Sequence, residues 1–419
     1  MNVEDYYKGL VNYTYSESKK YFTHDLDDDY QLFIIWQNGR SCEDEIIQAI
    51  KLNFNIVSSI SMQWSKKNAV QNFNRFYKAI DNPQISDKAE TMGEGEFLCL
   101  VVKDNAPEYH YRKTVSGAIE LVNSKTVKIK REVREICGGY YVHSTASPEE
   151  FYEQAILLFG EELLKEILDC RHDVLVFHQD LKGADGWSGF PELFTTLKYA
   201  SKYLVLRNFE FLPFDFFNND KDVDVLCENV MDFISASNSK VLSLTNGGAK
   251  LIVKIENKEV PFDIRFIGDD YYHSSWERDM LEQRIKTINN VYKPRLDDYF
   301  FSLLYHAVLQ KPEIKPIYVQ RFASISNELQ LDFFDVSKLN DKRYIASIIE
   351  GFFVFKNYLY TNPKDPEVYV NYSALKYLPK ELGGKKSKKL KSLIRLAVPR
   401  VFIDIIPSNI KIKAHRLIS

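Results

Sequence analysis

Two aspartates, Asp222 and Asp224, flank a single valine in the segment KDVDVLC, which otherwise reads as a buried strand. Residues two apart in a β-strand face the same side, so both carboxylates would lie together while Val223 and Val225 pack on the other side. Two adjacent negative charges repel each other unless a cation lies between them. A divalent ion held by oxygen ligands removes this repulsion and supplies positive charge for phosphate groups, as Mg2+ does in phosphoryl and nucleotidyl transfer.

A third carboxylate follows about 40 residues later. The segment KLIVKIENKEVPFDIRF predicts a strand, a turn at residues 256–258 and a second strand that carries Asp263 between Phe262 and Ile264. Arg265 lies two positions further on the same predicted face. Three acidic side chains on adjoining strands predict a site for Mg2+ or Mn2+. The alternative is that the Asp-x-Asp pair lies at an exposed strand end and is simply solvated by water.

The pair of aspartates on one strand and the single aspartate on a later strand resemble the nucleotidyltransferase fold. The resemblance is to the branch of fukutin-like and phosphocholine-transferring proteins that modify glycans, and it covers about residues 190–310. It implies that Asp222 and Asp224 match the family's pair and that Asp263 matches its third carboxylate. It also implies one or two Mg2+ ions that activate an acceptor hydroxyl and stabilise the nucleotide phosphates.

The family's Gly-Ser turn before the aspartate pair is replaced here by LVLRNFEFLPFDF. Phosphate binding would then depend on neighbouring residues. The residues expected to contact nucleotide or substrate are Arg207, Asn208, Arg265 and Asp269, with Gly247 and Gly248 of TNGGAK as an alternative phosphate-binding turn. The segment GDDYYHSSWER could bind a sugar through its acids and aromatic rings, or it could be a turn followed by the start of an amphipathic helix.

The segment YYVHSTASPEEFYEQ places His143 just before a predicted helix, whose N-terminus favours phosphate. Together with YQLFIIWQNG and FNIV, it resembles a nucleoside diphosphate kinase over about residues 28–165. The resemblance implies that His143 accepts a phosphoryl group. The phosphate-binding partners it suggests are Arg112, Thr114, Arg131 and Arg134. Trp36 replaces the family's lysine, so a domain that binds nucleotide without catalysis, or only serves as a scaffold, is an equal alternative.

Hydrophobic periodicity predicts a multidomain α+β or α/β chain. In the first part, the predicted strands are 30–36, 55–64 and 97–102, the predicted helices are 42–54, 65–80 and 147–167, and residues 81–96 are a predicted loop. His306, on a strongly apolar helical segment, is expected to be a core residue. The predicted domains are a ferredoxin-like, kinase-like domain at 1–168, a nucleotidyltransferase-like mixed sheet at 169–292, a helical domain at 293–384 and a basic amphipathic tail at 385–419.

Composition limits the class of protein. The chain is 45% hydrophobic and 14% aromatic, which indicates a folded protein. Its five cysteines are odd in number and far apart, which favours a reducing cytoplasm over a disulfide framework or a zinc site. No run approaches the roughly 20 apolar residues that a spanning helix needs. These features predict a cytoplasmic protein that is soluble or peripheral to a membrane.

The charge distribution is uneven along the chain. The net charge is −3, yet residues 385–419 contain ten lysines or arginines against one acid, Asp404. Leucines and isoleucines interleave with these basic residues, a pattern typical of a helix on an anionic membrane surface. Docking of this tail on the acidic remainder of the chain is an equal alternative, and nucleic acid is the disfavoured rival partner.

These observations predict a metal-dependent transferase that uses a nucleotide-activated donor to modify or build a glycan or polyol phosphate in surface-polysaccharide synthesis. Whether a phosphoryl, nucleotidyl or glycosyl group is transferred stays open. One competing hypothesis is a phosphohistidine enzyme that uses His143 for nucleotide phosphoryl transfer. Another is a nucleotide-binding scaffold without catalysis.

Overall fold

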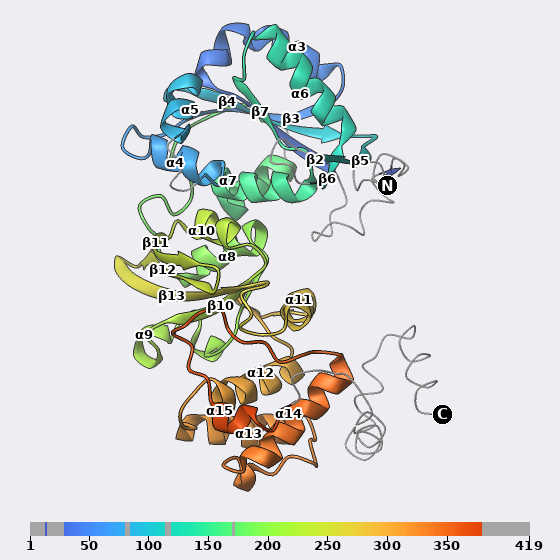
Figure 1. The fold of residues 1–419 in the computed structure, drawn as a ribbon. Helices are drawn as coiled ribbons and strands as arrows, with labels where there is room; N and C mark the ends of the chain where they lie inside the picture. Colours follow the sequence, from blue (N-terminus) through green and yellow to red (C-terminus); the bar gives the residue numbers. More distant parts are fainter. Residues whose placement is uncertain (1–12, 15–28, 80–83, 114–118, 170–171, 379–419) are drawn as a thin grey trace. The chain divides into compact units, whose positions relative to one another are not determined.

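The computed structural model describes residues 13–14, 29–79, 84–113, 119–169 and 172–378 (Figure 1). Within these ranges the protein is mixed α/β, with several separate sheets and no sheet closed into a barrel. None of the described helices combines the length and the apolar character needed to cross a membrane. The chain forms two compact units, of which the first comprises Met1–Lys202, Met231–Lys240 and Ile252–Val260 and the second comprises Tyr203–Val230, Val241–Leu251 and Pro261–Ser419.

A five-stranded sheet in the order β7-β2-β4-β3-β8 is the centre of the first unit. Strand β2 pairs antiparallel with β7 and β4, β3 pairs antiparallel with β4, and β8 is parallel to β3. The strands are β2 (Asp29–Ile35), β3 (Asn55–Gln63), β4 (Phe97–Asp104), β7 (Val142–Ser144) and β8 (His172–His178). A smaller sheet in the order β1-β5-β6 consists of β1 (Tyr13–Thr14), β5 (Glu108–Lys113) and β6 (Ile119–Asn123).

Helices cover both faces of the five-stranded sheet (Figure 1). On one face, Phe33 and Ile35 of β2 join a core with Ile46 and Ile129 of the covering helices α3 and α6. On the other face Trp36, just after β2, packs against aromatic rings of the α4 region. A strand buried on both sides is apolar throughout, which explains the run LFIIW. The helices of this part are α3 (Glu43–Lys51), α4 (Ala69–Phe76), α5 (Gln84–Met92), α6 (Ser124–Ile136), α7 (Pro148–Asp169) and α8 (Phe190–Ala200).

The three predicted strands of this part correspond to β2, β3 and β4 and are confirmed. The prediction of a loop at 81–96 is wrong, because α5 occupies Gln84–Met92. Ala89 and Met92 are three positions apart and both are buried, so this polar segment has a narrow apolar stripe. The helix α6 and the β5–β6 hairpin were not predicted.

A second five-stranded sheet has the order β11-β12-β13-β10-β9, in which β10 is parallel to β13 and antiparallel to β9. Its strands are β9 (Tyr203–Val205), β10 (Val223–Cys227), β11 (Lys240–Thr245), β12 (Gly248–Ile255) and β13 (Lys258–Phe266). Glu256 and Asn257 both have positive φ angles and form a tight turn between β12 and β13, which confirms the predicted strand, turn and strand.

Helices make up most of the rest of the second unit, in which α12 is buried along nearly its whole length. Its residue His306 is 5% exposed, which confirms the expected core position. Between α14 and α15, residues 361–371, here called the strap, run back beside β10 and β13 (Figure 1). The remaining elements are α9 (Phe216–Asn219), α10 (Val230–Ser237), α11 (Ser274–Glu282), β14 (Ile285–Lys286), β15 (Tyr292–Lys293), α12 (Leu296–Leu309), α13 (Pro316–Glu328), α14 (Lys342–Lys356) and α15 (Tyr372–Leu375).

The compact units follow a different division from the predicted domains. The predicted boundary at 168/169 lies inside the first unit, and the predicted helical region from 293 shares the second unit with β9 and β10. The predicted basic tail, 385–419, lies outside the described residues.

Candidate metal centre

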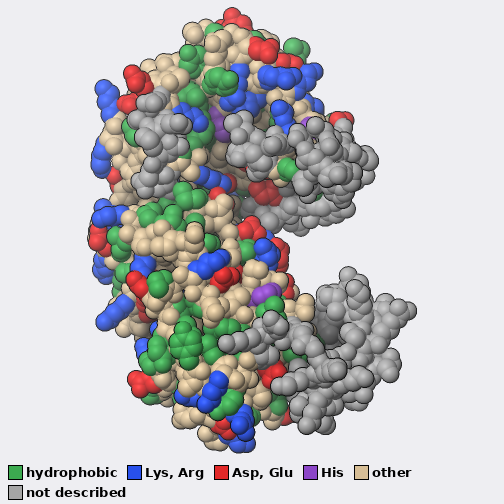
Figure 2. Space-filling view, viewed as in Figure 1, with side chains coloured by type: hydrophobic (Ala, Val, Ile, Leu, Met, Phe, Trp, Pro, Cys, Tyr) green, Lys and Arg blue, Asp and Glu red, His purple; other side chains and the backbone are tan. Residues whose placement is uncertain are grey.

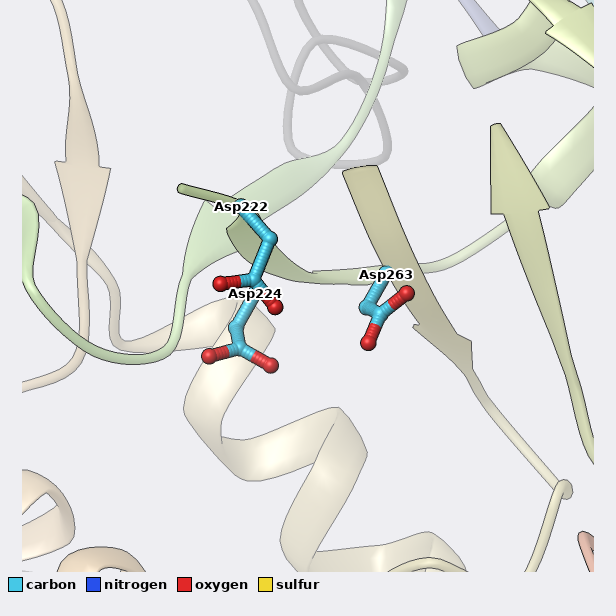
Figure 3. Close-up of side chains that lie close together, drawn as sticks. All are labelled: Asp222, Asp224 and Asp263. Carbon is cyan, nitrogen blue, oxygen red and sulfur yellow. The ribbon is translucent and has the colours of Figure 1, made fainter. Parts of the chain in front are cut away.

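Three aspartates converge at one side of the second sheet (Figure 3). Asp224 of β10 and Asp263 of β13 are direct partners across the parallel pair, and Asp222 immediately precedes β10. One carboxylate oxygen from each lies within 4.8 Å of the other two. Oxygens that share one Mg2+ or Ca2+ ion, at roughly 2.0–2.6 Å from it, lie at most about 4–5 Å apart. The three side chains can therefore share a divalent ion with little rearrangement.

The three carboxyl groups lie so close together that each one opposes ionisation of the others. Partial burial, followed by the charges of Asp224 and Asp263, raises the pKa of Asp222 to about 6. Burial and the charge of Asp224 also raise the pKa of Asp263, against the opposing effect of Arg265 and Lys250. A bound cation would lower the pKa of both Asp222 and Asp263, because it stabilises the ionised carboxylates.

Arg207 forms a two-pronged ion pair with Asp224. Its Nε donates to Asp224 Oδ2 at 3.1 Å and its Nη2 donates to Oδ1 at 2.5 Å, with only 8% of the arginine exposed. Each carboxylate oxygen keeps a second lone pair for another partner. The guanidinium, which was predicted to bind phosphate, holds both oxygens of Asp224, and two-pronged geometry is well suited to orienting a carboxylate.

Tyr271 links this ion pair to helix α12. Arg207 Nη1 lies 3.4 Å from the Tyr271 hydroxyl, which is 2.9 Å from Nδ1 of His306. The Gln310 amide donates to the backbone oxygen of Tyr271 at 3.2 Å. The Arg265 guanidinium lies 4.4 Å above the same tyrosine ring. Tyr271 therefore fixes both arginines that flank the aspartates.

Asp269 was predicted to contact substrate, but its side chain is fully buried. Its two oxygens accept the backbone N–H groups of Phe266 and Tyr271, at 3.1 and 2.8 Å. Glu277 of α11 is equally buried and accepts the N–H groups of Gly268 and Tyr272. These two carboxyl groups shape the loop after β13, so Asp269 positions Tyr271 rather than a substrate.

The alternative reading of GDDYYHSSWER, a turn and a helix start, is confirmed, since α11 begins at Ser274. Trp276 is fully buried and donates from Nε1 to Asp298 Oδ1 at 3.0 Å. It has no exposed ring with which to stack on a sugar.

The paired carboxyl groups predict an unusual pH dependence of stability. Burial, followed by the charge of Asp269, raises the pKa of Glu277 to about 8. The folded protein thus binds this proton more tightly than the unfolded chain, where a glutamate titrates near 4.3. The stabilising contribution is complete at low pH and is lost as the pH rises through about 8. Urea denaturation should show the free energy of unfolding falling more steeply between pH 5 and 9 in the native protein than in Glu277→Gln; parallel profiles would contradict the raised pKa of Glu277.

The other two predicted binding residues of this unit, Asn208 and Arg265, also form hydrogen bonds within the protein. Asn208 has a left-handed backbone, with φ of 58°, and its side-chain oxygen accepts from Arg321 Nη1 at 2.7 Å. Arg265 Nη1 donates to the Gly247 carbonyl at 2.7 Å and to Asp365 of the strap at 2.9 Å. Asn208 therefore ties the β9 loop to α13, and Arg265 ties β13 to the β11–β12 turn and the strap.

In the first unit, His143 lies in the edge strand β7, and α7 begins only at Pro148. The histidine is 7% exposed, and its Nε2 lies 2.8 Å from Gln154 Oε1. Burial and the nearby Lys130 charge lower its pKa well below the usual range, so the ring is neutral. The rings of Phe76 and Tyr77 flank it edge to face.

Of the predicted phosphate-binding residues of this unit, only Arg134 lies close to His143. Its Nε donates to the backbone oxygen of Val142 at 3.0 Å. Arg112 of β5 and Arg131 of α6 are exposed, and Thr114 lies outside the described residues. Figure 2 shows several basic side chains on the visible surface of this part of the chain.

Two basic residues near His143, Lys88 and Lys130, were not predicted from the sequence to belong to this site. Lys130 Nζ donates to the Ser144 carbonyl at 2.8 Å, and Lys88 Nζ lies 3.2 Å above the ring of Tyr77. Lys130 precedes Arg134 by four positions, so the two share a face of α6, whereas Arg131 does not. Helical spacing was the signal that could have selected Lys130.

Trp36, in place of the kinase family's lysine, is wholly buried and donates from Nε1 to the Tyr77 hydroxyl at 3.0 Å. It belongs to an aromatic cluster with Trp64, Phe73 and Phe97. The position is thus a core position in this protein, and a charged side chain there would have to be buried.

No protein-family model, curated protein or solved structure matches the chain.

Proposed function

We propose that this protein is a metal-dependent transferase of the nucleotidyltransferase fold, with Asp222, Asp224 and Asp263 as ligands of Mg2+ or Mn2+. The observation that carries the proposal is the convergence of three carboxylates, two on neighbouring strands and one just before β10, within 4.8 Å of one another. The parallel pairing of β10 and β13, which sets Asp224 opposite Asp263, supports the nucleotidyltransferase-like sheet.

The charged side chains of the site have separate roles that suit the transfer of a group to a hydroxyl. A divalent ion at the three aspartates supplies positive charge to the phosphates of a donor. Arg207 holds both oxygens of Asp224 in place through its two-pronged contact. Asp222 takes no part in this ion pair, which leaves its carboxylate available to accept the proton of an acceptor hydroxyl.

The substrates in this proposal are a nucleotide-activated donor and a glycan or polyol phosphate acceptor, in surface-polysaccharide synthesis at the cytoplasmic face of a membrane. Support comes from the resemblance to the glycan-modifying branch and from the basic residues of 385–419. For the first unit, the strand order β7-β2-β4-β3 with antiparallel neighbours supports a ferredoxin-like, kinase-like domain.

The test is a titration of the full chain with Mn2+ and Mg2+, followed by a panel of nucleoside diphosphates, triphosphates and nucleotide sugars. We expect the metal to raise the melting temperature and nucleotide binding to require it, because a ligand that binds the folded state stabilises it. Absence of both effects at millimolar metal would reject the enzyme and leave a scaffold.

A second candidate, a phosphohistidine enzyme or nucleotide-binding domain in the first unit, is favoured by one observation. Lys88, Lys130 and Arg134 gather around the buried His143, and the charges of all three act to lower its pKa. Three cations at one place suit a phosphate group. Comparing nucleotide turnover in His143→Ala and Asp263→Asn separates the two: loss only in the former would move the chemistry to the first unit.

A further inference from the structure

A small cleft adjoins the metal centre at Asp263, and Arg207 is not among its lining residues. Asp263 and Arg265 of β13, Lys250 of β12 and the strap residues Lys364 and Glu367 line a space of about 180 Å³. This volume is below the roughly 300 Å³ at which pockets for drug-sized ligands begin, so the cleft suits a small group. Asp263 belongs both to the cleft and to the metal centre.

Two ion pairs join the strap to the cleft, and they differ in exposure. Arg265 and Asp365 are both 16% exposed and lie 2.9 Å apart, in a contact that Arg265 shares with the Gly247 carbonyl. Lys250 and Glu367 lie 2.5 Å apart but are 50% and 68% exposed. Exposed pairs contribute little to stability and are readily exchanged for other partners. The first pair anchors the strap, and the second leaves a cation with a replaceable counter-ion.

The position of the strap is closely defined by the β11–β12 turn. A Cβ atom at Gly247 would lie 2.3 Å from the backbone nitrogen of Asp365, so only glycine allows this approach. Asp365 Oδ1 accepts the backbone N–H of Glu367 at 2.9 Å, which directs Glu367 towards Lys250. The carboxylate of Glu367 is thus held against the one exposed cation of β12 in the cleft.

We propose that this cleft is a subsite for a phosphate group of the substrate, with Lys250 as its cationic contact and Glu367 as an internal counter-ion that the phosphate replaces. The inference rests on the proposed function, because the phosphate would lie between Lys250 and an ion at Asp263. A phosphate carries more charge than a carboxylate and offers three acceptor oxygens, so it competes well for an exposed lysine. The subsite would select donors or acceptors with a phosphate next to the reacting group.

The test is isothermal titration of the full chain with inorganic pyrophosphate, in Mn2+ and again in EDTA. Lys250→Met should weaken binding about tenfold, the loss expected for one charge-assisted hydrogen bond. Glu367→Gln should strengthen binding severalfold, because it removes the competing carboxylate. Lys240→Met, which removes an exposed lysine at the far end of β11, is the matched control and should bind as the native protein does.

Equal binding by Lys250→Met and Lys240→Met would overturn the subsite, and so would unchanged or weaker binding by Glu367→Gln. Lys250 and Glu367 are both at least half exposed, so both variants should fold, and their melting temperatures check this. A separate Mn2+ titration reports on the metal centre. If Mn2+ fails to bind but the two variants still differ in EDTA, the proposed function is wrong and the phosphate subsite stands.

Discussion

Replacing Asp263 by asparagine is expected to weaken Mn2+ binding by at least about 100-fold, because groups that only support a metal ligand already cost 10–100-fold when they are removed. The change keeps the size of the side chain and removes one of three charges that lie within 4.8 Å of one another. It also leaves the Arg207–Asp224 pair intact, so a loss of metal binding cannot be attributed to that pair. Titration calorimetry or the electron paramagnetic resonance of free Mn2+ measures the affinity.

The matched control is Glu259→Gln, which removes an exposed carboxylate from the same strand β13. It changes the net charge by the same amount as Asp263→Asn, so it separates a general electrostatic effect from loss of a ligand. Mn2+ should bind this control and the native protein equally. If Asp263→Asn binds Mn2+ as the control does, the three aspartates are a solvated acidic cluster and the proposed chemistry has no centre.

The side of the strand on which each aspartate lies was accessible from the sequence, because it depends on local periodicity, whereas the pairing of β10 with β13 is not local. Residues two apart on a strand face one side, and the turn residues Glu256 and Asn257 marked a second strand for Asp263. The sequence did not show that Asp222 lies just before β10 rather than within it. This difference leaves the carboxylate on the same side as Asp224 (Figure 3).

The partners of the basic residues were not accessible in the same way. Arg207 and Asp224 are 17 residues apart, and Arg265 and Asp365 are 100 apart, so neither pairing follows from spacing along one element. A sequence shows that an arginine is charged, but it does not show whether a carboxylate already forms an ion pair with it. Phosphate binding was therefore predicted for Arg207 and Asn208, or for Gly247 and Gly248, without knowledge of these contacts. The sequence did not single out Lys250, an exposed lysine of β12 that lines the cleft beside Asp263.

The other differences between the predicted and the observed site concern residues that are buried in the structure. Asp269 and Trp276 look like binding residues in a polar, aromatic segment, yet both are fully enclosed and their polar atoms are satisfied within the protein. Trp36 likewise stands where a family resemblance predicts a charged residue, and the aromatic cluster around it makes it part of the core. Local sequence does not report how many distant side chains converge on a position, which is what determines burial.

Arg207→Met should lower the free energy of unfolding by about 3 kcal/mol, at the lower end of the range for breaking a buried ion pair because Asp224 is 20% exposed. The variant leaves three carboxylates close together without the cation that pairs with Asp224, and it removes a partner of the Tyr271 hydroxyl. Urea denaturation measures the loss. Arg207→Lys keeps the positive charge without the two-pronged contact. Its free energy of unfolding should therefore lie between those of the native protein and Arg207→Met.

Metal provides the discriminating control for this prediction. If the loss arises from repulsion among the aspartates, saturating Mn2+ should restore more stability to Arg207→Met than it adds to the native protein, because the ion replaces the missing positive charge. The double variant Arg207→Met, Asp224→Asn should also be more stable than Arg207→Met alone, since it removes the unpaired carboxylate. The contrary result is that Mn2+ stabilises Arg207→Met and the native protein equally and that the double variant recovers no stability. Arg207 would then support the fold through packing alone and would have no part in holding Asp224 for a metal ion.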